Sequence, residues 1–306
     1  MRIVLIGQAA FGAKTLQALL ERGEQVVGVY APPDESAGKL DPLKQMALEQ
    51  HIPLFQPGRM RDPNVYQSYA KLAPDLNVMA FVTDIVPVSI LNYPRLGTIQ
   101  YHPSLLPRHR GGSAINWPII QGETRTGITI FWPDAGIDTG PILLQKEADI
   151  SPKDTLGSLY YNKLFPLGIE ALMESVELVR QGKAPKIHQD ESKVTYEGLC
   201  REEQALIDWA KPISEVYNLI RGTDPQPGAT TFVRGSKLKI YDSELLLQTF
   251  DKAPGEIVAT DSRGIVVTCR GGCILIKRVQ IPGKPKIAAS DYANSGVIKV
   301  GARLGR

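Results

Sequence analysis

The sequence has few cysteines and few histidines for its length. Three of its 306 residues are cysteines, namely Cys200, Cys269 and Cys273, and four are histidines. An odd number of cysteines without C-x-x-C spacing argues against a disulfide framework or a zinc site and fits a reducing cytoplasm. Cys269 and Cys273 lie on either side of Gly271-Gly272, so we expect two small strand residues beside a turn.

Long apolar runs and a strong net charge are also missing. The first residues, MRIVLIGQ, reach polar side chains too soon for a signal peptide, and no segment approaches the roughly 18 apolar residues that cross a bilayer. We therefore expect a cytoplasmic protein without a membrane partner. The net charge of +3 is too small to indicate nucleic acid as a partner. Residues 207–306 nevertheless hold 15 Lys and Arg against 9 Asp and Glu, a surplus of six, which leaves a polyanion contact open.

The first half of the sequence is typical of an α/β domain. Arg2–Gly7 and Gln25–Tyr30 are predicted to be buried strands, and Phe11–Arg22 is predicted to be the helix between them. This strand–helix–strand start predicts a mostly parallel, Rossmann-like sheet with right-handed crossovers. The further elements expected here are the strands Leu76–Phe81, Thr98–Tyr101 and Gly127–Phe131 and the amphipathic helix Leu167–Arg180.

The pattern changes after about residue 183. Gln189–Ser192 is polar and typical of a linker, and a short helix is expected over Ile213–Arg221. Short apolar runs between glycines and prolines then predict the strands Ala229–Val233, Leu238–Tyr241, Gly255–Ala259, Ile265–Cys269 and Ile274–Val279. Such a series is typical of a small, OB-like β-barrel. With the length, it predicts two domains, an α/β domain at 1–205 and a β-barrel domain at 206–306.

The first β–α turn lacks one glycine of a dinucleotide fingerprint. It reads Gly7-Gln-Ala-Ala-Phe-Gly12, with Ala9 where a second glycine would let a pyrophosphate approach the backbone. Glycines that let a helix pack closely on a strand explain the turn better than a nicotinamide cofactor does. A nicotinamide-dependent oxidoreductase therefore stays a distant alternative.

Residues 101–112, YHPSLLPRHRGG, place two of the four histidines in one loop. His102 falls at the end of a predicted strand, and open α/β sheets bind ligands outside the carboxyl ends of their strands. Residues two apart in a strand point to the same face, so Gln100 and His102 should project together. Arg108, His109 and Arg110 are expected at the loop surface, with attraction of an anionic substrate tail as their alternative role.

A second polar cluster follows another predicted strand of the same sheet. It reads Pro133-Asp-Ala-Gly-Ile-Asp-Thr-Gly140. Asp134 and Asp138 stand beside glycines, so both fit an ordinary turn-capping role. The oxygen ligands are too sparse for a calcium loop. These residues alone leave turn capping and a functional carboxylate equally open.

The two loops resemble those of the 10-formyltetrahydrofolate-dependent formyltransferase family. The resemblance rests on HPSLLPRHRGGSAINW and GITIFWPDAGIDTGPILLQ, and it continues through IGQAAFG, TYEGLCREEQALIDW, RGTDPQPGATT and GKPKIAASDY. Family members include methionyl-tRNA formyltransferase, glycinamide ribonucleotide formyltransferase and sugar-amine formyltransferases. The resemblance is strong to another member, the N-terminal hydrolase domain of 10-formyltetrahydrofolate dehydrogenase, and to methionyl-tRNA formyltransferase.

This resemblance implies a catalytic set, a folate pocket and a co-substrate. His102 and Asp138 match the family's catalytic histidine and aspartate, whereas Gln100 stands where the family has asparagine. The implied folate-binding positions are Asp84, Ile85, Val86, Ser104, Leu105, Leu106, Pro107 and Asp138. The implied co-substrate is 10-formyltetrahydrofolate, released as tetrahydrofolate, with neither a metal nor NAD.

Formyl transfer requires side chains of these types. Attack on the N10-formyl carbonyl builds a tetrahedral oxyanion, which an amide N–H and a protonated imidazole stabilise, and one such donor contributes about 10²–10³ in rate. His102 would protonate N10 as it leaves. Asp138 would favour the charged imidazole, orient its ring and accept a proton from the nucleophile. Gln100 has the amide but one methylene more than asparagine, which leaves the rate and the acceptor open.

The sequence leaves several functions open. The formyl acceptor is water, a small amine or, less favoured, initiator methionyl-tRNA. Loop 31–44, APPDESAGKLDPLK, has three acidic residues against two lysines, whereas the matching loop of the tRNA enzymes is basic. The alternative of another class is a folate-binding protein with little catalysis, which only Gln100 supports. A complete dehydrogenase needs modules that do not fit in 306 residues, unless the chain is a fragment.

Overall fold

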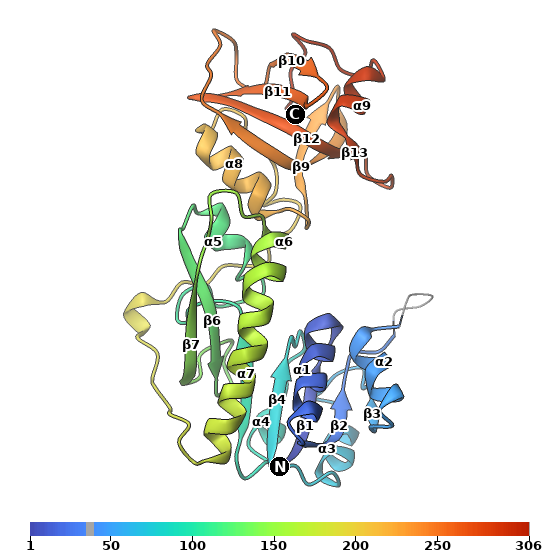
Figure 1. Cartoon of the computed structure of the whole chain (residues 1–306), viewed down its shortest axis with the longest axis vertical. Helices are drawn as coiled ribbons and strands as arrows, with labels where there is room; N and C mark the ends of the chain where they lie inside the picture. The colour runs from blue at the N-terminus through green and yellow to red at the C-terminus, as the bar shows by residue number, and fades with distance from the viewer. Residues whose placement is uncertain (35–39, 306) are drawn as a thin grey trace. The chain divides into compact units, whose positions relative to one another are not determined.

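The computed structural model describes residues 1–34 and 40–305. Residues 35–39 of loop 31–44 lie outside this range, so the charge argument for that loop rests on the sequence alone. The chain forms two compact units (Figure 1). Unit 1 comprises Met1–Ala114, Gly127–Ala148 and Asn162–Glu197, and unit 2 comprises Ile115–Thr126, Asp149–Tyr161 and Gly198–Arg306.

Unit 1 is built on a seven-stranded sheet with the order β3-β2-β1-β4-β5-β6-β7. The strands are β1 (Arg2–Gly7), β2 (Gln25–Tyr30), β3 (Leu54–Phe55), β4 (Leu76–Ala80), β5 (Thr98–His102), β6 (Arg125–Phe131) and β7 (Ile142–Asp149). The strands from β3 to β5 pair in parallel, and β6 runs antiparallel to β5. The predicted Rossmann-like, mostly parallel sheet is confirmed. Its strand order reverses between β1 and β4, where open α/β sheets bind their ligands.

Helices cover both faces of this sheet (Figure 1). The helices in the described part of unit 1 are α1 (Ala9–Glu21), α2 (Pro42–Glu49), α3 (Pro63–Ala70), α4 (Val88–Leu91) and α7 (Phe165–Arg180), and a π-helical turn at Tyr160–Leu164 precedes α7. The short helix α6 (Leu156–Leu159) belongs to unit 2. On one face, Gly168 of α7 packs so closely that an added Cβ would lie 2.5 Å from the ring of Tyr101 and 3.0 Å from that of Phe11. On the other face, the hydroxyl of Tyr69 in α3 donates to the side chain of Asn77 in β4 at 2.9 Å.

The core of unit 1 explains why these segments form strands. Val4, Ile6 and Met79 of β1 and β4 are buried together with Ile90 of α4. Burial of one such side chain contributes about 1.5–3 kcal/mol, so short runs rich in branched apolar residues are stable only between helical layers.

Unit 2 contains a six-stranded antiparallel sheet with the order β10-β11-β12-β9-β8, and β13 pairs with β12. Its elements, besides α6, are α5 (Asn116–Ile120), α8 (Ile213–Gly222), β8 (Ala229–Val233), β9 (Ser236–Leu246), β10 (Ile257–Asp261), β11 (Gly264–Cys269), β12 (Gly272–Gln280), β13 (Ile287–Ala288) and α9 (Ala289–Asn294). A 3₁₀ turn at Glu191–Lys193 belongs to unit 1. The five strands predicted for this region are present. A closed OB-like barrel and a domain boundary near residue 205 stay predictions.

One detail of the sequence interpretation, the two neighbouring cysteines, recurs in the structure. Cys269 and Cys273 are free, buried residues at the adjacent ends of β11 and β12, as expected. Burial raises the pKa of Cys269 to about 12. Within residues 1–34 and 40–305, no helix is long and apolar enough to cross a membrane.

Candidate active site

Gln100 and His102 lie side by side at the carboxyl end of β5. Gln100 pairs with Met79 of β4 and with Phe131 of β6, and His102 pairs with Thr129 of β6. The two-residue spacing places both side chains on one face of the sheet, as predicted. Gln100 is half-buried, and its amide has no hydrogen-bond partner among the described residues. This amide is therefore available to a ligand.

The ring of His102 contacts a backbone oxygen and a carboxylate. Its Nε2 lies 2.9 Å from the carbonyl oxygen of His109, and its Nδ1 lies 3.5 Å from Oδ2 of Asp138. Because a carbonyl oxygen only accepts, Nε2 carries a hydrogen and donates it. The side chain is 5% exposed, so this contact fixes a buried ring with Nδ1 directed at Asp138.

Asp138 and Asp134 have different environments. Asp134 accepts hydrogen bonds from the N–H of Gly136 at 2.9 Å and from the hydroxyl of Thr139 at 2.5 Å, which makes it a turn cap. Asp138 has a φ of +56° and accepts the N–H of Gly111 at 2.9 Å through the oxygen that faces His102. The structure thus separates a capping aspartate from one that approaches the histidine.

The loop after His102 is fixed by polar side chains of β6 and β7. The Thr129 hydroxyl donates to the carbonyl of Ser104 at 2.7 Å and accepts the N–H of Leu106 at 3.1 Å. Gln145 donates to the carbonyl of Leu106 at 2.8 Å. Ser104 is fully buried and Leu106 nearly so, whereas Leu105 and Pro107 are half-buried. Of these four predicted folate positions, Leu105 and Pro107 are the more accessible.

His109 and Arg110 correct the expectation of a surface rim. Their exposed fractions are 3% and 6%, and only Arg108 of the three basic residues is exposed. His109 Nδ1 lies 3.2 Å from a carboxylate oxygen of Glu197. Arg110 binds Gln189 and Glu191. Burial is tolerated here because each charged or polar group meets partners about 80 residues further along the chain.

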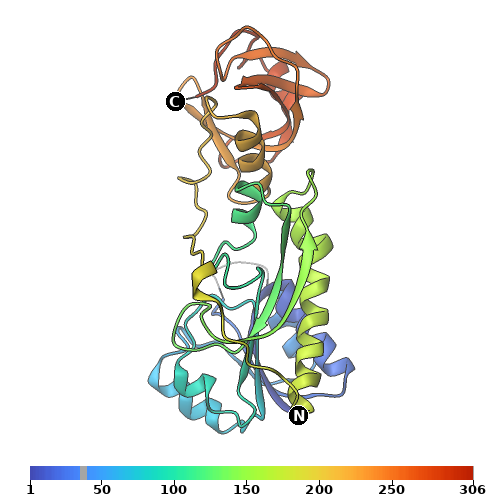
Figure 2. The ribbon, with the colours of Figure 1, turned by 90° about the vertical axis from the view of Figure 1, so that its left-hand side faces the viewer.

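Those partners belong to residues 189–197, which we call the strap. The Thr195 hydroxyl accepts the N–H of His109 at 2.8 Å, and the Thr195 carbonyl accepts that of Arg110 at 3.0 Å. Gln189 donates from Nε2 to the carbonyls of Asp138 at 2.8 Å and Gly140 at 2.7 Å. In Figure 2 the strap, with its short yellow helical turn, passes beside the green loops of unit 1. The polar composition that predicted a linker at Gln189–Ser192 gave no signal of these contacts.

The loop after β4 places its three predicted residues in three environments. Both carboxylate oxygens of Asp84 accept backbone N–H groups, from Met60 at 2.6 Å and from Ile85 at 2.8 Å. The side chain of Ile85 is exposed, and that of Val86 is buried in the core. Phe81, which sequence reasoning did not single out, is exposed with a φ of +62°. The loop therefore leaves the apolar side chains of Phe81 and Ile85 exposed.

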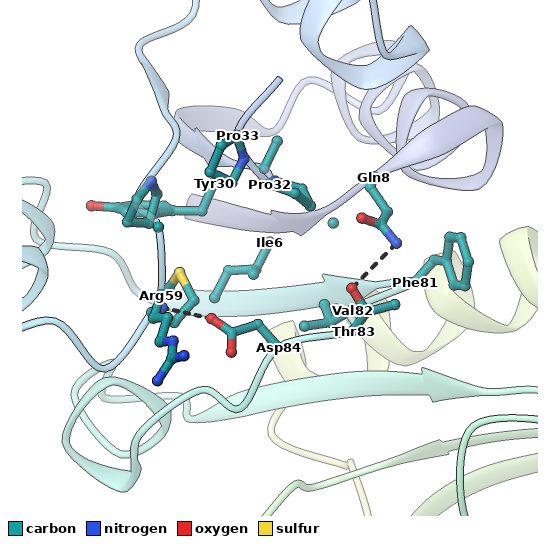
Figure 3. Close-up of a pocket in the computed structure, with 15 residues that line it drawn as sticks. Ile6, Gln8, Tyr30, Pro32, Pro33, Arg59, Phe81, Val82, Thr83 and Asp84 are labelled. Atoms are coloured by element: carbon teal, nitrogen blue, oxygen red, sulfur yellow. Dashed lines mark hydrogen bonds between the residues drawn. The ribbon is translucent and has the colours of Figure 1, made fainter. Parts of the chain in front are cut away.

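A pocket of about 300 Å³ opens at the carboxyl ends of β1, β2 and β4 (Figure 3). Its wall combines apolar residues with the polar side chains of Gln8, Thr83 and Asp84, and Gln8 reaches Thr83 at 3.5 Å. Met79 of β4 pairs with Gln100 of β5 in parallel. Two residues further along, Phe81 is therefore level with His102, and the chain from Phe81 to Asp84 continues past it. The pocket thus adjoins the strand ends that carry the histidine and the glutamine.

The amino end of α1 is occupied by a carboxylate of the chain itself. Oδ2 of Asp41 accepts the N–H of Ala9 at 2.7 Å, and Oδ1 accepts that of Leu43 at 2.9 Å, capping α2. A phosphate bound at this turn would compete with Asp41 for the same N–H and meet its negative charge. Among the described residues, no group of three or more His, Cys, Asp or Glu is arranged to hold a metal ion.

Comparison with known families then identifies the chain. A model of the formyl transferase family matches residues 1–176, and a model of the formyl transferase C-terminal domain matches residues 200–296. The chain belongs to the formyl transferase family. It is 39% identical over 316 residues to the mitochondrial 10-formyltetrahydrofolate dehydrogenase of Mus musculus, covering 98% of this chain and 34% of that protein. It is also 39% identical over 310 residues to the methionyl-tRNA formyltransferase of Geotalea daltonii, covering 100% of this chain and 98% of that protein.

This family member therefore spans about a third of the length of the dehydrogenases and nearly the whole of the tRNA enzyme. Solved structures share its fold. HypX from Aquifex aeolicus in complex with tetrahydrofolic acid has a TM-score of 0.72 at 19% identity, covering 98% of this chain and 48% of that one. The N-formyltransferase from Helicobacter canadensis, in complex with folinic acid and dTDP-3-aminofucose, has a TM-score of 0.71 at 19% identity, covering 90% and 98%.

Proposed function

We propose that this chain removes the formyl group from 10-formyltetrahydrofolate and delivers it to water or to a small amine. The observation that carries this proposal is the approach of His102 to Asp138 at a strand end, in a member of the formyl transferase family. The similarity to a 10-formyltetrahydrofolate dehydrogenase and to a methionyl-tRNA formyltransferase, and the tetrahydrofolate bound to one structural neighbour, support folate as the formyl donor.

In the proposed reaction the nucleophile attacks the formyl carbon and the carbonyl oxygen becomes an oxyanion. The free amide of Gln100 stabilises that charge together with the protonated ring of His102. Asp138 accepts a proton from the nucleophile, and His102 donates one to N10 from Nδ1, the ring nitrogen that is not bonded to His109, as the bond from carbon to N10 breaks. The products are tetrahydrofolate and either formate or a formylated amine.

Two loops are proposed to hold the folate. The exposed Phe81 and Ile85 supply apolar surface for the pterin ring after β4, and Leu105 and Pro107 supply the facing wall. Asp84 shapes the adjoining pocket by fixing the backbone at Met60. NAD has no place in this proposal, since Asp41 already holds the amino end of α1.

A second candidate function is methionyl-tRNA formyltransferase. One observation favours it, namely the match to the Geotalea daltonii enzyme over 98% of that protein's length. The surplus of six positive charges in residues 207–306 is compatible with a tRNA contact. Against it stand the acidic residues of loop 31–44.

The experiment that tests both is release of tetrahydrofolate from 10-formyltetrahydrofolate by the purified protein. Three reactions are compared, with no acceptor, with a panel of small amines and with charged initiator methionyl-tRNA. Release in the first or second reaction supports the proposal, and the formate or formyl-amine product identifies the acceptor. Release only with the tRNA establishes the second candidate instead. If the protein binds folate but releases no tetrahydrofolate in any reaction, both enzymatic functions are wrong, and the hypothesis of a folate-binding protein with little catalysis remains.

A further inference from the structure

We infer that Gln189 is a positioning residue that holds the backbone of Asp138 in place for proton transfer, with Arg110 fixing the direction of the Gln189 amide. This inference rests on the proposed function, because it concerns the efficiency of the same site. Neither residue is placed to touch the reacting atoms. Both act through Asp138.

The amide of Gln189 connects two loops that approach each other only in the folded chain. Nε2 donates to the carbonyls of Asp138 and Gly140 at 2.8 and 2.7 Å, and both hydrogens of the amide are thereby used. Oε1 accepts from Nε and Nη2 of Arg110 at 3.2 and 2.8 Å. Carbonyl oxygens only accept and a guanidinium only donates, so this amide has a single satisfactory orientation.

Asp138 needs such support because its backbone is strained. Its φ of +56° lies in the left-handed region, which residues other than glycine adopt only at a cost in free energy. The hydrogen bond to its own carbonyl fixes the peptide that follows Asp138 and so the direction of its carboxylate. That carboxylate lies 3.5 Å from His102, a distance that a small rotation of the backbone would lengthen.

Arg110 is buried and held through its backbone, which makes it a firm anchor for the amide. Its backbone N–H donates to the carbonyl of Thr195, and its guanidinium also binds Glu191 at 2.7 Å. Arg110 is 6% exposed, whereas the Glu191 side chain is 69% exposed. The buried contact with Gln189 is therefore the part of this network that leads to Asp138, and the exposed ion pair lies outside it.

The test uses Gln189→Glu, which has nearly the same shape. The glutamate keeps an acceptor for Arg110, but it turns an oxygen instead of an N–H toward the two carbonyls. We expect kcat for tetrahydrofolate release to fall about 10²-fold, as for a misplaced catalytic group, while KM for 10-formyltetrahydrofolate stays within about threefold. Gln189→Met, which removes all the hydrogen bonds, should show the same split between kcat and KM. Melting temperatures of both variants show whether they fold.

Glu191→Gln is the matched control, because it alters the exposed partner of the same arginine, and its kcat should equal that of the wild type. If Gln189→Glu keeps wild-type kcat, or if KM rises with kcat unchanged, the positioning role is wrong even though the enzyme is active. If only Gln189→Met loses kcat, the contact with Arg110 alone matters, and the role assigned to the carbonyl bonds is also wrong. A wild-type protein without turnover would instead overturn the proposed function, an outcome distinct from these.

Discussion

Nε2 of His102 donates a hydrogen bond to the carbonyl oxygen of His109 at 2.9 Å, so one histidine of the loop orients the other through its backbone. The contact leaves Nδ1 as the ring atom that faces Asp138. His109 is itself fixed by Thr195 and Glu197, both of the strap. The orientation of the proposed catalytic ring therefore depends on residues from three separate parts of the chain.

Removal of the proposed acid or of its carboxylate partner should stop turnover without abolishing folate binding. We expect His102→Ala and Asp138→Asn each to lower kcat for tetrahydrofolate release by about 10²–10⁴-fold, the range for a lost proton-transfer group. Folate binding, followed by fluorescence quenching, should persist. Asp134→Asn is the control, because it changes a turn-capping aspartate of the same loop. Equal losses in Asp134→Asn and Asp138→Asn would contradict the different roles assigned to them.

The amide of Gln100 should contribute to the rate even though the family has asparagine at this position. Gln100→Leu shortens the side chain by one atom and removes the N–H, and we expect kcat to fall about 10²–10³-fold as for a lost oxyanion donor. Gln100→Asn should keep activity above that of the leucine variant. An unchanged kcat in Gln100→Leu would show that the oxyanion is stabilised elsewhere.

Close packing between α7, α1 and β5 should make Gly168 intolerant of a side chain. The added Cβ of Gly168→Ala would meet two core rings, and such overpacking costs about 1–3 kcal/mol, of which the better helix propensity of alanine offsets up to about 1 kcal/mol. We expect a lower melting temperature. Gly198→Ala, where nothing lies within 4 Å of the added Cβ, should melt like the wild type. A stabilised Gly168→Ala would mean that the rings of Phe11 and Tyr101 move aside freely.

The stability of unit 2 should depend on pH through Glu202. Hydrogen bonds from Lys237 and Lys239 lower the pKa of Glu202 to about 2 from the ordinary 4.5. Because the folded-state pKa lies below the unfolded one, this stabilisation is present above pH 4.5 and is lost as the pH falls toward 2. The side chain is 45% exposed, so solvent screening limits the effect to about 1 kcal/mol or less.

Glu202→Gln measures this contribution directly. The variant should melt slightly below the wild type at pH 7, and the difference should shrink toward zero as the pH falls from 4.5 to 2. A difference that stays constant over that range would show that the carboxylate charge is not its cause.

The strands follow from local features of the sequence, whereas the pairing of His102 with Asp138 is implied only by the family resemblance. Apolar runs such as Arg2–Gly7 form strands because both of their faces are buried, and His102 was placed correctly because it ends such a run. The local sequence pattern could not predict the burial of Arg110 and His109 or the contacts of Gln189. A buried arginine looks like a surface arginine until its partner is known, and the partners of Arg110 lie 79 and 81 residues further along the chain.

The strap is synthesised after the loops that it binds. His102, Gly111 and Asp138 leave the ribosome well before Gln189 and Thr195 do, so the nascent chain carries His102 and Asp138 before the strap that supports their loops exists. The region matched by the first family model ends at residue 176, ahead of the strap. A chain cut after residue 188 would keep all three proposed catalytic residues and lack the segment that binds the loops beside them.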